Sequence, residues 1–164
     1  MNIVFEKMNE KHKKGIMTVF NYYVENSTSA FPSEALPDQF YAMLLKKLEG
    51  YPAYALIDTD KDTVVGFCKL SAYNTCPTFV KTACLTYFIA PEYTGKGLGS
   101  NCLSKLECDA KQMNIEHLIS EISSENSGSI SFHKNHGFTV AGELHNVGEK
   151  LNRKFGIVYM EKSI

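Results

Sequence analysis

The feature that most constrains the fold is a glycine-rich turn set between a strand pattern and a helix pattern. A β-rich run over residues 79–89 leads into Thr94–Gly99 (TGKGLG), and apolar residues at helical spacing follow. Glycine accepts positive φ and has no Cβ, so main-chain N–H groups can converge there on a ligand. The first amides of a helix also lack intrahelical partners and lie at the positive end of its dipole. The turn therefore suits a pyrophosphate, with an ordinary flexible turn as the alternative.

Two other phosphate-binding motifs do not fit this turn. A Walker loop ends in Gly-Lys-Ser/Thr, whereas Lys96 is followed by Gly97. A dinucleotide fingerprint requires Gly-x-Gly-x-x-Gly at the start of a βαβ unit, and the spacing here differs. The sequence thus does not predict an NTPase or a dinucleotide-binding domain.

Strand and helix patterns alternate along the whole chain. Apolar alternation predicts strands over residues 2–8, 53–57, 63–71, 79–89, 117–122, 138–144 and 155–161. Helical spacing predicts helices over residues 10–26, 38–49, after the glycine-rich turn, and 127–136. We expect one α+β domain over residues 1–164, with a mixed, mostly antiparallel sheet of six or seven strands flanked by about four helices.

Composition narrows the classes of partner. The chain is 44% hydrophobic with a formal net charge of −1, values typical of a globular protein, and we expect neither nucleic-acid binding nor membrane binding. Five cysteines without a close pair favour reduced thiols over a disulfide framework. Because residues 1–8 carry no apolar run behind a basic segment and no run of about 18 apolar residues occurs, we expect a cytoplasmic location. His133 and His136 lie three residues apart without a suitable third ligand, so no metal site is expected.

Three segments carry a family resemblance. Thr94–Gly99 matches the pattern Gln/Arg-x-x-Gly-x-Gly/Ala except at Thr94, and residues 126–138 (NSGSISFHKNHGF) match a second, longer pattern. Both resemble the GNAT superfamily of N-acetyltransferases. Residues 21–31 (NYYVENSTSAF) and 147–150 (VGEK) are similar to its phosphinothricin acetyltransferase branch. Helix capping by Asn126 and Gly137 is an alternative explanation for part of the second match.

The resemblance implies a GNAT-like sheet and an acetyl-CoA-dependent N-acetyltransferase. The acetyl group would move to a primary amine of a small molecule, an amino-acid analogue among the candidates, by direct attack in a ternary complex. Two alternatives remain at this stage: a non-catalytic acyl-CoA sensor, and a protein or peptide N-acetyltransferase. The implied cofactor contacts are Phe88, Ile89, Gly95, Lys96, Gly97, Leu98, Gly99, Ser100, Asn126, Ser129 and His133. A splayed sheet between residues 87–89 and 120–122 would form the slot for the pantetheine arm.

The catalytic residues are less clear from sequence. His133 stands where relatives place a tyrosine or histidine near the leaving thiolate, so it is the candidate acid, with a purely capping or cofactor-binding role as the alternative. The branch usually carries a glutamate base at a position occupied here by Cys84. Proton removal through water or by Glu121 is therefore the hypothesis. A nucleophilic Cys84 is a further alternative, as is a small apolar filler.

The acceptor side departs most from the family pattern. An expected arginine falls on Cys76, a tyrosine on Phe79, and a tryptophan and an aspartate on Lys154 and Gly156. Because an acidic substrate needs cationic or multi-donor anchoring, we expect an acceptor other than phosphinothricin. The candidate acceptor contacts are Phe31, Tyr73, Cys84 and Lys154. A homodimer is the expected assembly, since such dimers are the commonest soluble oligomers.

Overall fold

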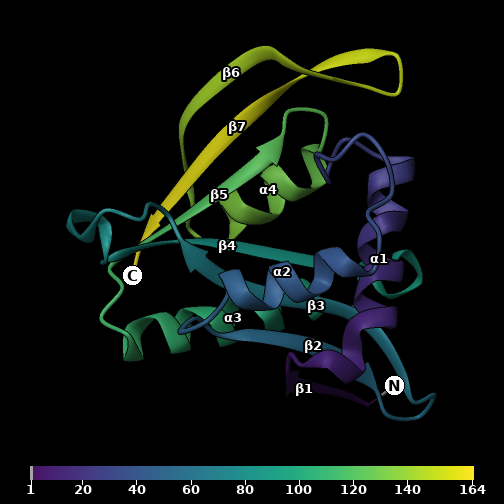
Figure 1. Ribbon diagram of the computed structural model, residues 1–164. Helices are drawn as coiled ribbons and strands as arrows, with labels where there is room; N and C mark the ends of the chain where they lie inside the picture. The colour runs from purple at the N-terminus through teal and green to yellow at the C-terminus, as the bar shows by residue number, and fades with distance from the viewer. Residues whose placement is uncertain (1) are drawn as a thin grey trace.

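The computed structural model describes residues 2–164 as a seven-stranded sheet covered by helices on both faces (Figure 1). The strands are β1 (Ile3–Lys7), β2 (Ala53–Asp58), β3 (Thr63–Ala72), β4 (Thr82–Ile89), β5 (His117–Ser123), β6 (Thr139–Lys150) and β7 (Arg153–Ser163). The helices are α1 (Lys13–Asn26), α2 (Gln39–Lys47), α3 (Leu98–Gln112) and α4 (Ser127–Asn135). Short 3₁₀ helices cover Glu10–His12, Pro77–Phe79 and Pro91–Tyr93. The expected α+β fold and strand number are confirmed.

The sheet has one parallel junction. Its strand order is β1-β2-β3-β4-β5-β7-β6, and every neighbouring pair is antiparallel except β4 and β5. The β4–β5 register contains three residue pairs and ends at Cys84↔Ile119. Beyond that point the two strands continue without pairing, so the sheet opens along residues 85–89 and 120–123.

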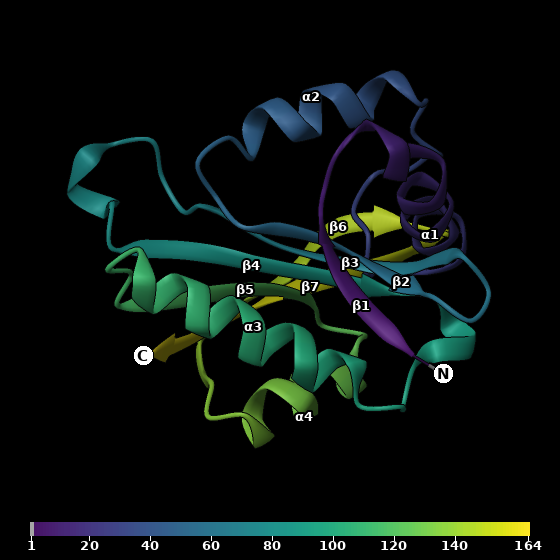
Figure 2. The ribbon, with the colours of Figure 1, turned by 90° about the horizontal axis from the view of Figure 1, so that it is seen from below.

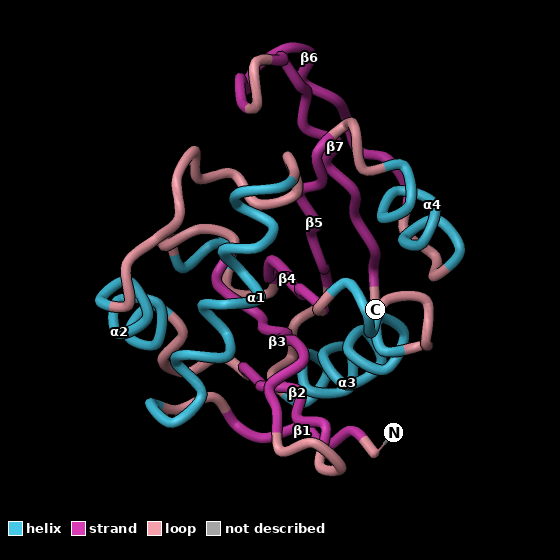
Figure 3. The backbone as a smooth tube through the Cα atoms, turned by 90° about the vertical axis from the view of Figure 1, so that its right-hand side faces the viewer, coloured by secondary structure: helices cyan, strands magenta, loops and turns pink. Residues whose placement is uncertain are grey.

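Each face of the sheet packs against its own pair of helices. Figures 2 and 3 show α1 and α2 on one face and α3 and α4 on the other. On the α1/α2 face, Ile16 and Tyr41 are completely buried beside Phe67. On the other face, Leu103 and Leu106 of α3 pack with residues of β3, β4, β5 and β7. Burial of two apolar layers stabilises the sheet from both sides.

Two boundaries differ from the sequence prediction for local reasons. The strand expected from Phe79 begins at Thr82, because Pro77 starts a 3₁₀ turn in which the Val80 amide bonds the Pro77 carbonyl. The expected strand over residues 138–144 instead reaches Lys150 and forms a long hairpin with β7 (Figure 1). Leu151 and Asn152 make its turn with φ values of 54° and 58°.

Candidate functional site

A cavity of about 1060 Å³ lies where β4 and β5 part. Residues from α1, α2 and the 27–37 loop line one side, and residues from the glycine-rich turn and α4 line the other. The cavity therefore passes through the open seam of the sheet. It brings together these sequence-predicted residues: Phe31, Tyr73, Cys84, Phe88, Ile89, Gly95, Gly99, Glu121, Asn126, Ser129 and His133.

The glycine-rich turn borders the cavity at Thr94, Gly95 and Gly99 and leaves main-chain donors free. Gly95 and Gly97 have φ values of +70° and +82°, and a Cβ on either would meet nothing within 4 Å. Gly97 caps α3, and the first helical bond runs from the Asn101 amide to the Gly97 carbonyl. The amides of Leu98, Gly99 and Ser100 hence have no intrahelical partner, and they lie at the positive end of a 15-residue helix. This end of the cavity favours an anion.

Three predicted cofactor residues contribute their backbone and not their side chains to this turn. The Lys96 ammonium lies 5.2 Å from the Tyr93 ring centroid, and Leu98 is buried in the core. The Ser100 hydroxyl bonds Nε2 of His136 at 3.0 Å. Within the described part of the chain, neither these three residues nor Gly97 line the cavity.

The open edge of β4 offers one further amide. The Ala90 amide donates to Val65 of β3, so alternation along the strand directs the Ile89 amide to the opposite edge, where β5 has separated. The Tyr23 hydroxyl donates to the Ile89 carbonyl at 2.6 Å. Tyr23 thereby fixes the end of the strand that borders the seam.

Helix α4 begins at the cavity and carries His133. The Asn126 side chain accepts from the Ser129 amide at 3.0 Å and donates to the Ser29 hydroxyl at 3.0 Å. It therefore caps the helix and joins it to the 27–37 loop. One turn after Ser129, His133 is 2% exposed and lines the cavity.

Hydrogen bonds on both ring nitrogens set the state of His133. Nδ1 lies 2.8 Å from the Ser129 carbonyl, which can only accept, so Nδ1 carries the proton. Nε2 then accepts from the Tyr87 hydroxyl at 2.7 Å. Burial lowers the pKa of His133, partly opposed by the Ser129 bond, and His136 lowers it further. Burial also raises the pKa of Tyr87, so both groups are neutral at pH 7.

Tyr87 lies in the predicted slot, but the sequence did not indicate a role for its side chain. Its position on β4 is typical of a core strand, and the partner His133 is 46 residues away in the chain. The two rings are nearly parallel, with centroids 5.7 Å apart. The two residues meet because the fold places β4 beside α4. Their spacing in the sequence therefore does not predict the pair.

The opposite part of the cavity has a polar floor on the α1/α2 face of the sheet. Lys69 pairs with Thr86 and Ser71 with Cys84 in the β3–β4 register, and all four line the cavity. Glu121 of β5 joins them and is exposed there. The alternation of β3, with Phe67 and Ser71 on the same face as Lys69, was a signal available in the sequence for this lysine.

Cys84 is a protonated thiol in this floor. Burial and, to a smaller extent, nearby Glu121 raise its pKa, Lys69 lowers it, and the resulting pKa is about 11. A thiolate is the nucleophilic form of cysteine, and little of it exists at pH 7 under these conditions. The environment favours the interpretation of Cys84 as a small packing residue.

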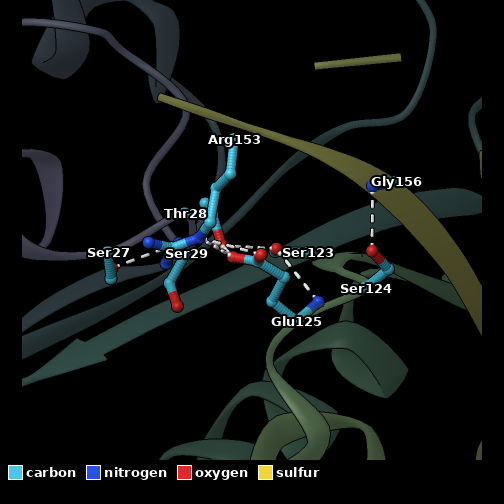
Figure 4. Close-up of polar contacts among 8 residues, drawn as sticks. All are labelled: Ser27, Thr28, Ser29, Ser123, Ser124, Glu125, Arg153 and Gly156. Carbon is cyan, nitrogen blue, oxygen red and sulfur yellow. Dashed lines mark hydrogen bonds and ion pairs between the residues drawn. The ribbon is translucent and has the colours of Figure 1, made fainter. Parts of the chain in front are cut away.

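The 27–37 loop forms a wall of the cavity and is fastened by polar contacts (Figure 4). The Thr28 hydroxyl bonds Ser123 at 2.7 Å and Glu125 at 3.0 Å. Glu125 also accepts from the Arg153 guanidinium at 2.8 and 2.9 Å, and Arg153 lowers the pKa of that carboxyl. In Figure 4 these side chains converge between the loop, the end of β5 and the start of β7.

Two of the predicted acceptor contacts, Phe31 and Tyr73, line the cavity and pack against other aromatic rings, whereas a third, Lys154, lies elsewhere. The Phe31 ring stacks on Phe155 with centroids 6.2 Å apart, and Tyr73 meets Phe79 edge to face at 5.6 Å. Lys154 is exposed on the β6–β7 hairpin opposite Glu149 and is not among the residues lining the cavity. The structure thus does not bring Lys154 to the site, because the long hairpin carries it past the seam.

The described residues contain no group of three or more His, Cys, Asp or Glu side chains suited to a metal ion. Over residues 2–164, every helix is too short or too polar to cross a bilayer.

Comparison with known proteins identifies the family. Residues 16–138 match the model of the acetyltransferase (GNAT) family. The chain belongs to this family. The GNAT chain is therefore an acetyl-CoA-dependent N-acetyltransferase, as the sequence resemblance implied, and acetyl-CoA is its cosubstrate.

Relatives of this GNAT chain acylate amino-acid analogues according to their names. This chain is 29% identical over 116 residues to the L-methionine sulfoximine/L-methionine sulfone acetyltransferase of Salmonella typhimurium, and the match covers 71% of this chain and 67% of that protein. It is 24% identical to the phosphinothricin N-acetyltransferase of Streptomyces coelicolor, covering 94% and 92%. A phosphinothricin acetyltransferase structure from Sinorhizobium meliloti, in complex with AcCoA, superposes with a TM-score of 0.93 at 20% identity, covering 100% and 89%.

Proposed function

We propose that this GNAT acetyltransferase acetylates the primary amine of a small amino acid or amino-acid analogue. The observation that carries the proposal is one cavity that joins the glycine-rich turn of α3 to the polar floor of β3, β4 and β5 through the seam. A cofactor on one side and an amine on the other would meet where the sheet opens. The names of the relatives support the same class of acceptor.

The residues around the turn fit acetyl-CoA. The open space over Gly95 and Gly97 admits a diphosphate close to the backbone, and the free amides from Leu98 to Ser100 would bind its oxygens. Phe88 and Ile89 would hold the pantetheine arm along the free edge of β4, and Asn126 and Ser129 would border it at α4. When bound, acetyl-CoA supplies an acetyl group activated as a thioester.

We assign the chemical roles as follows. The Ile89 amide polarises the acetyl carbonyl from the open edge of β4. Glu121, directly or through a water, removes a proton from the acceptor ammonium, since it is the carboxylate among the described residues that line the cavity. The Tyr87 hydroxyl, positioned by His133 on the side of α4, would give its proton to the leaving thiolate and regain one from water. The apolar residues of α1 and α2 exclude water from the acceptor.

An amine panel with acetyl-CoA tests the proposal. Release of CoA thiol is followed with L-methionine sulfone, phosphinothricin, simple polyamines and an N-terminal alanine peptide. We expect turnover with L-methionine sulfone and little with the polyamines or the peptide. Binding of CoA in calorimetry without turnover of any amine would contradict the proposal and favour a sensor.

The role of Glu121 is tested with Glu121→Gln. General base catalysis contributes roughly 10²-fold or more, so we expect kcat/KM for the best acceptor to fall by about that factor. The pH dependence of the rate should also change, because the proposed base is lost. An unchanged pH profile would refute the assignment and leave proton removal to water alone.

We also propose that the protein forms a homodimer in the cytoplasm as a single domain. β6 is the last strand in the sheet order, and Val140, Leu144 and Val147 on it are 47%, 47% and 56% exposed. An exposed strand edge with apolar side chains favours association with a second copy. The five free cysteines are compatible with a reducing compartment. Sedimentation tests the assembly, and cell fractionation tests the location.

A further inference from the structure

Among the described residues that line the cavity, two carry a formal charge, and both lie on the acceptor side, the α1/α2 face of the sheet. One is Glu121 and the other is Lys69, while His133 is held neutral by its hydrogen bonds. The sequence analysis assigned Glu121 a candidate role but gave none to Lys69. The lysine nevertheless lies on β3, opposite Thr86 of β4, on the face of the sheet that α1 and α2 cover.

Lys69 differs from the other shielded lysines of the described chain in having no protein partner. Lys150 donates to the Ala30 carbonyl, Lys105 pairs with Asp109, and Lys162 pairs with Glu107. The Lys69 ammonium makes no hydrogen bond or ion pair within residues 2–164. Every fully buried side-chain nitrogen or oxygen in that range does have a partner. The ammonium must therefore reach open space, which is the cavity that Lys69 lines.

The surroundings of this ammonium make an anionic ligand favourable. Helices α1 and α2 contribute Met17, Phe20 and Leu44 to the cavity, all apolar. The titratable neighbours are Cys84 on β4, a protonated thiol, and Glu121 one strand further across the sheet. Burial lowers the pKa of Lys69, which is the effect of keeping a charge in a partly dry site without a counter-ion. A bound carboxylate would relieve that cost.

Lys69 and Glu121 present opposite charges on one face of the sheet. Adjacent paired strands lie about 4.8 Å apart, so β3 and β5 are separated by about 10 Å at the last β4–β5 pair and by more at Glu121, with the small side chains of Cys84 and Thr86 between them. Glu121 extends from the strand that borders the seam, whereas Lys69 lies away from it. A zwitterion placed over Cys84 would direct its amine toward the seam and its carboxylate toward Lys69.

We infer that Lys69 is the specificity-determining residue that binds the α-carboxylate of the acceptor, with Glu121 facing the amine. The inference rests on the proposed function. It supplies a positive charge for the carboxylate, which Cys76, at the position of the family's expected arginine, does not. Amines without a carboxylate leave the ammonium unpaired, and polyamines are repelled by it. Selection for α-amino acids over simple amines follows from this one residue.

The test compares an acid with its amide in wild-type and variant enzymes. L-methionine sulfone and its carboxamide differ at the carboxylate alone. We expect the wild type to prefer the acid by about 10- to 100-fold in kcat/KM, the range for a charge-assisted hydrogen bond. Lys69→Met should remove that preference by raising KM for the acid, and it should leave the carboxamide nearly unchanged. Lys69→Arg should retain part of the preference.

Controls separate binding from folding and from the proposed function. Lys111→Met removes a positive charge from the exposed surface of α3 and should leave the preference intact. The KM for acetyl-CoA reports whether Lys69→Met is folded, and Lys69→Gln replaces it if it is not. A wild type that acetylates both probes equally, or a Lys69→Met variant that loses kcat on both, overturns the inference while the proposed function stands. A wild type that acetylates no amino acid overturns both.

Discussion

His133 shows how one side chain can couple the site to stability. Its ring is buried, donates to the Ser129 carbonyl and accepts from Tyr87, so the neutral form is the one that fits. Protonation would place a second N–H against the Tyr87 hydroxyl and add a charge to a desolvated position. The same contacts that orient the proton donor therefore penalise the imidazolium.

We predict an acid-dependent loss of stability that belongs to His133. Its pKa is lower in the folded chain than the unfolded value near 6.5, so the unfolded state binds the extra proton first. The contribution is complete above pH 6.5 and is lost as pH falls toward the folded value, by up to about 1.4 kcal/mol at pH 5.5. Urea unfolding at pH 7.5 and 5.5 should show a smaller difference for His133→Gln. Equal differences in both proteins would contradict the assignment.

At the scale of elements, the turn before α3 joins a backbone requirement to a binding function. Gly97 needs its left-handed φ to start the helix, and the space above it is open. Gly50 has a similar φ of +84° and also nothing within 4 Å of a built Cβ, but it lies between α2 and β2 and not in the turn before α3. Alanine variants at the two positions therefore carry the same backbone strain, and only the variant at Gly97 would affect the proposed ligand.

Replacement of either glycine by alanine should cost similar stability and different binding. A left-handed φ costs a non-glycine residue about 1–2 kcal/mol, so Gly97→Ala and Gly50→Ala should lose comparable free energy of unfolding. Gly97→Ala should also raise the Kd for CoA by about tenfold or more, since its methyl group fills the space proposed for the diphosphate. Calorimetry with CoA measures this. A weaker affinity in both variants would point to strain as the cause.

At the scale of the whole molecule, contacts distant in sequence close the cavity. The Lys150 ammonium at the end of β6 donates to the Ala30 carbonyl at 2.7 Å, a buried contact across 120 residues. Burial lowers the pKa of this lysine. Together with the Thr28–Glu125–Arg153 contacts of Figure 4, it fixes the 27–37 loop against the hairpin. The position of the 27–37 loop, which forms a wall of the cavity, therefore depends on these long-range contacts.

Lys150→Met should loosen that wall. The Ala30 carbonyl would lose its buried partner, which costs about 1–3 kcal/mol. We expect a lower unfolding free energy together with a higher KM for the acceptor and little change in KM for acetyl-CoA. Lys134→Met, at an exposed position on α4, is the control. Unaltered stability in Lys150→Met would show that the contact is not needed to hold the loop.

Sequence patterns were sufficient for the elements and for the place of the glycine-rich turn before α3, but less so for the acceptor end. Local periodicity and glycine spacing encode β4, the turn and α3 within one segment, and the family patterns lie there too. Lys69 and Tyr87 gain their roles from strand register and from helices that arrive later in the chain. Lys154 was expected near the acceptor, yet the hairpin extends too far to bring it there. Register and hairpin length are tertiary outcomes that single-residue patterns do not specify.

The early end of the β4–β5 ladder has a consequence for turnover. Because the gap between these strands runs through the sheet from face to face, the two reactants in the proposed arrangement approach each other from opposite sides. Neither has to travel through the other's entrance, and the same holds for the two products. The architecture therefore imposes no fixed order of binding or release: either reactant can bind first, and either product can leave first.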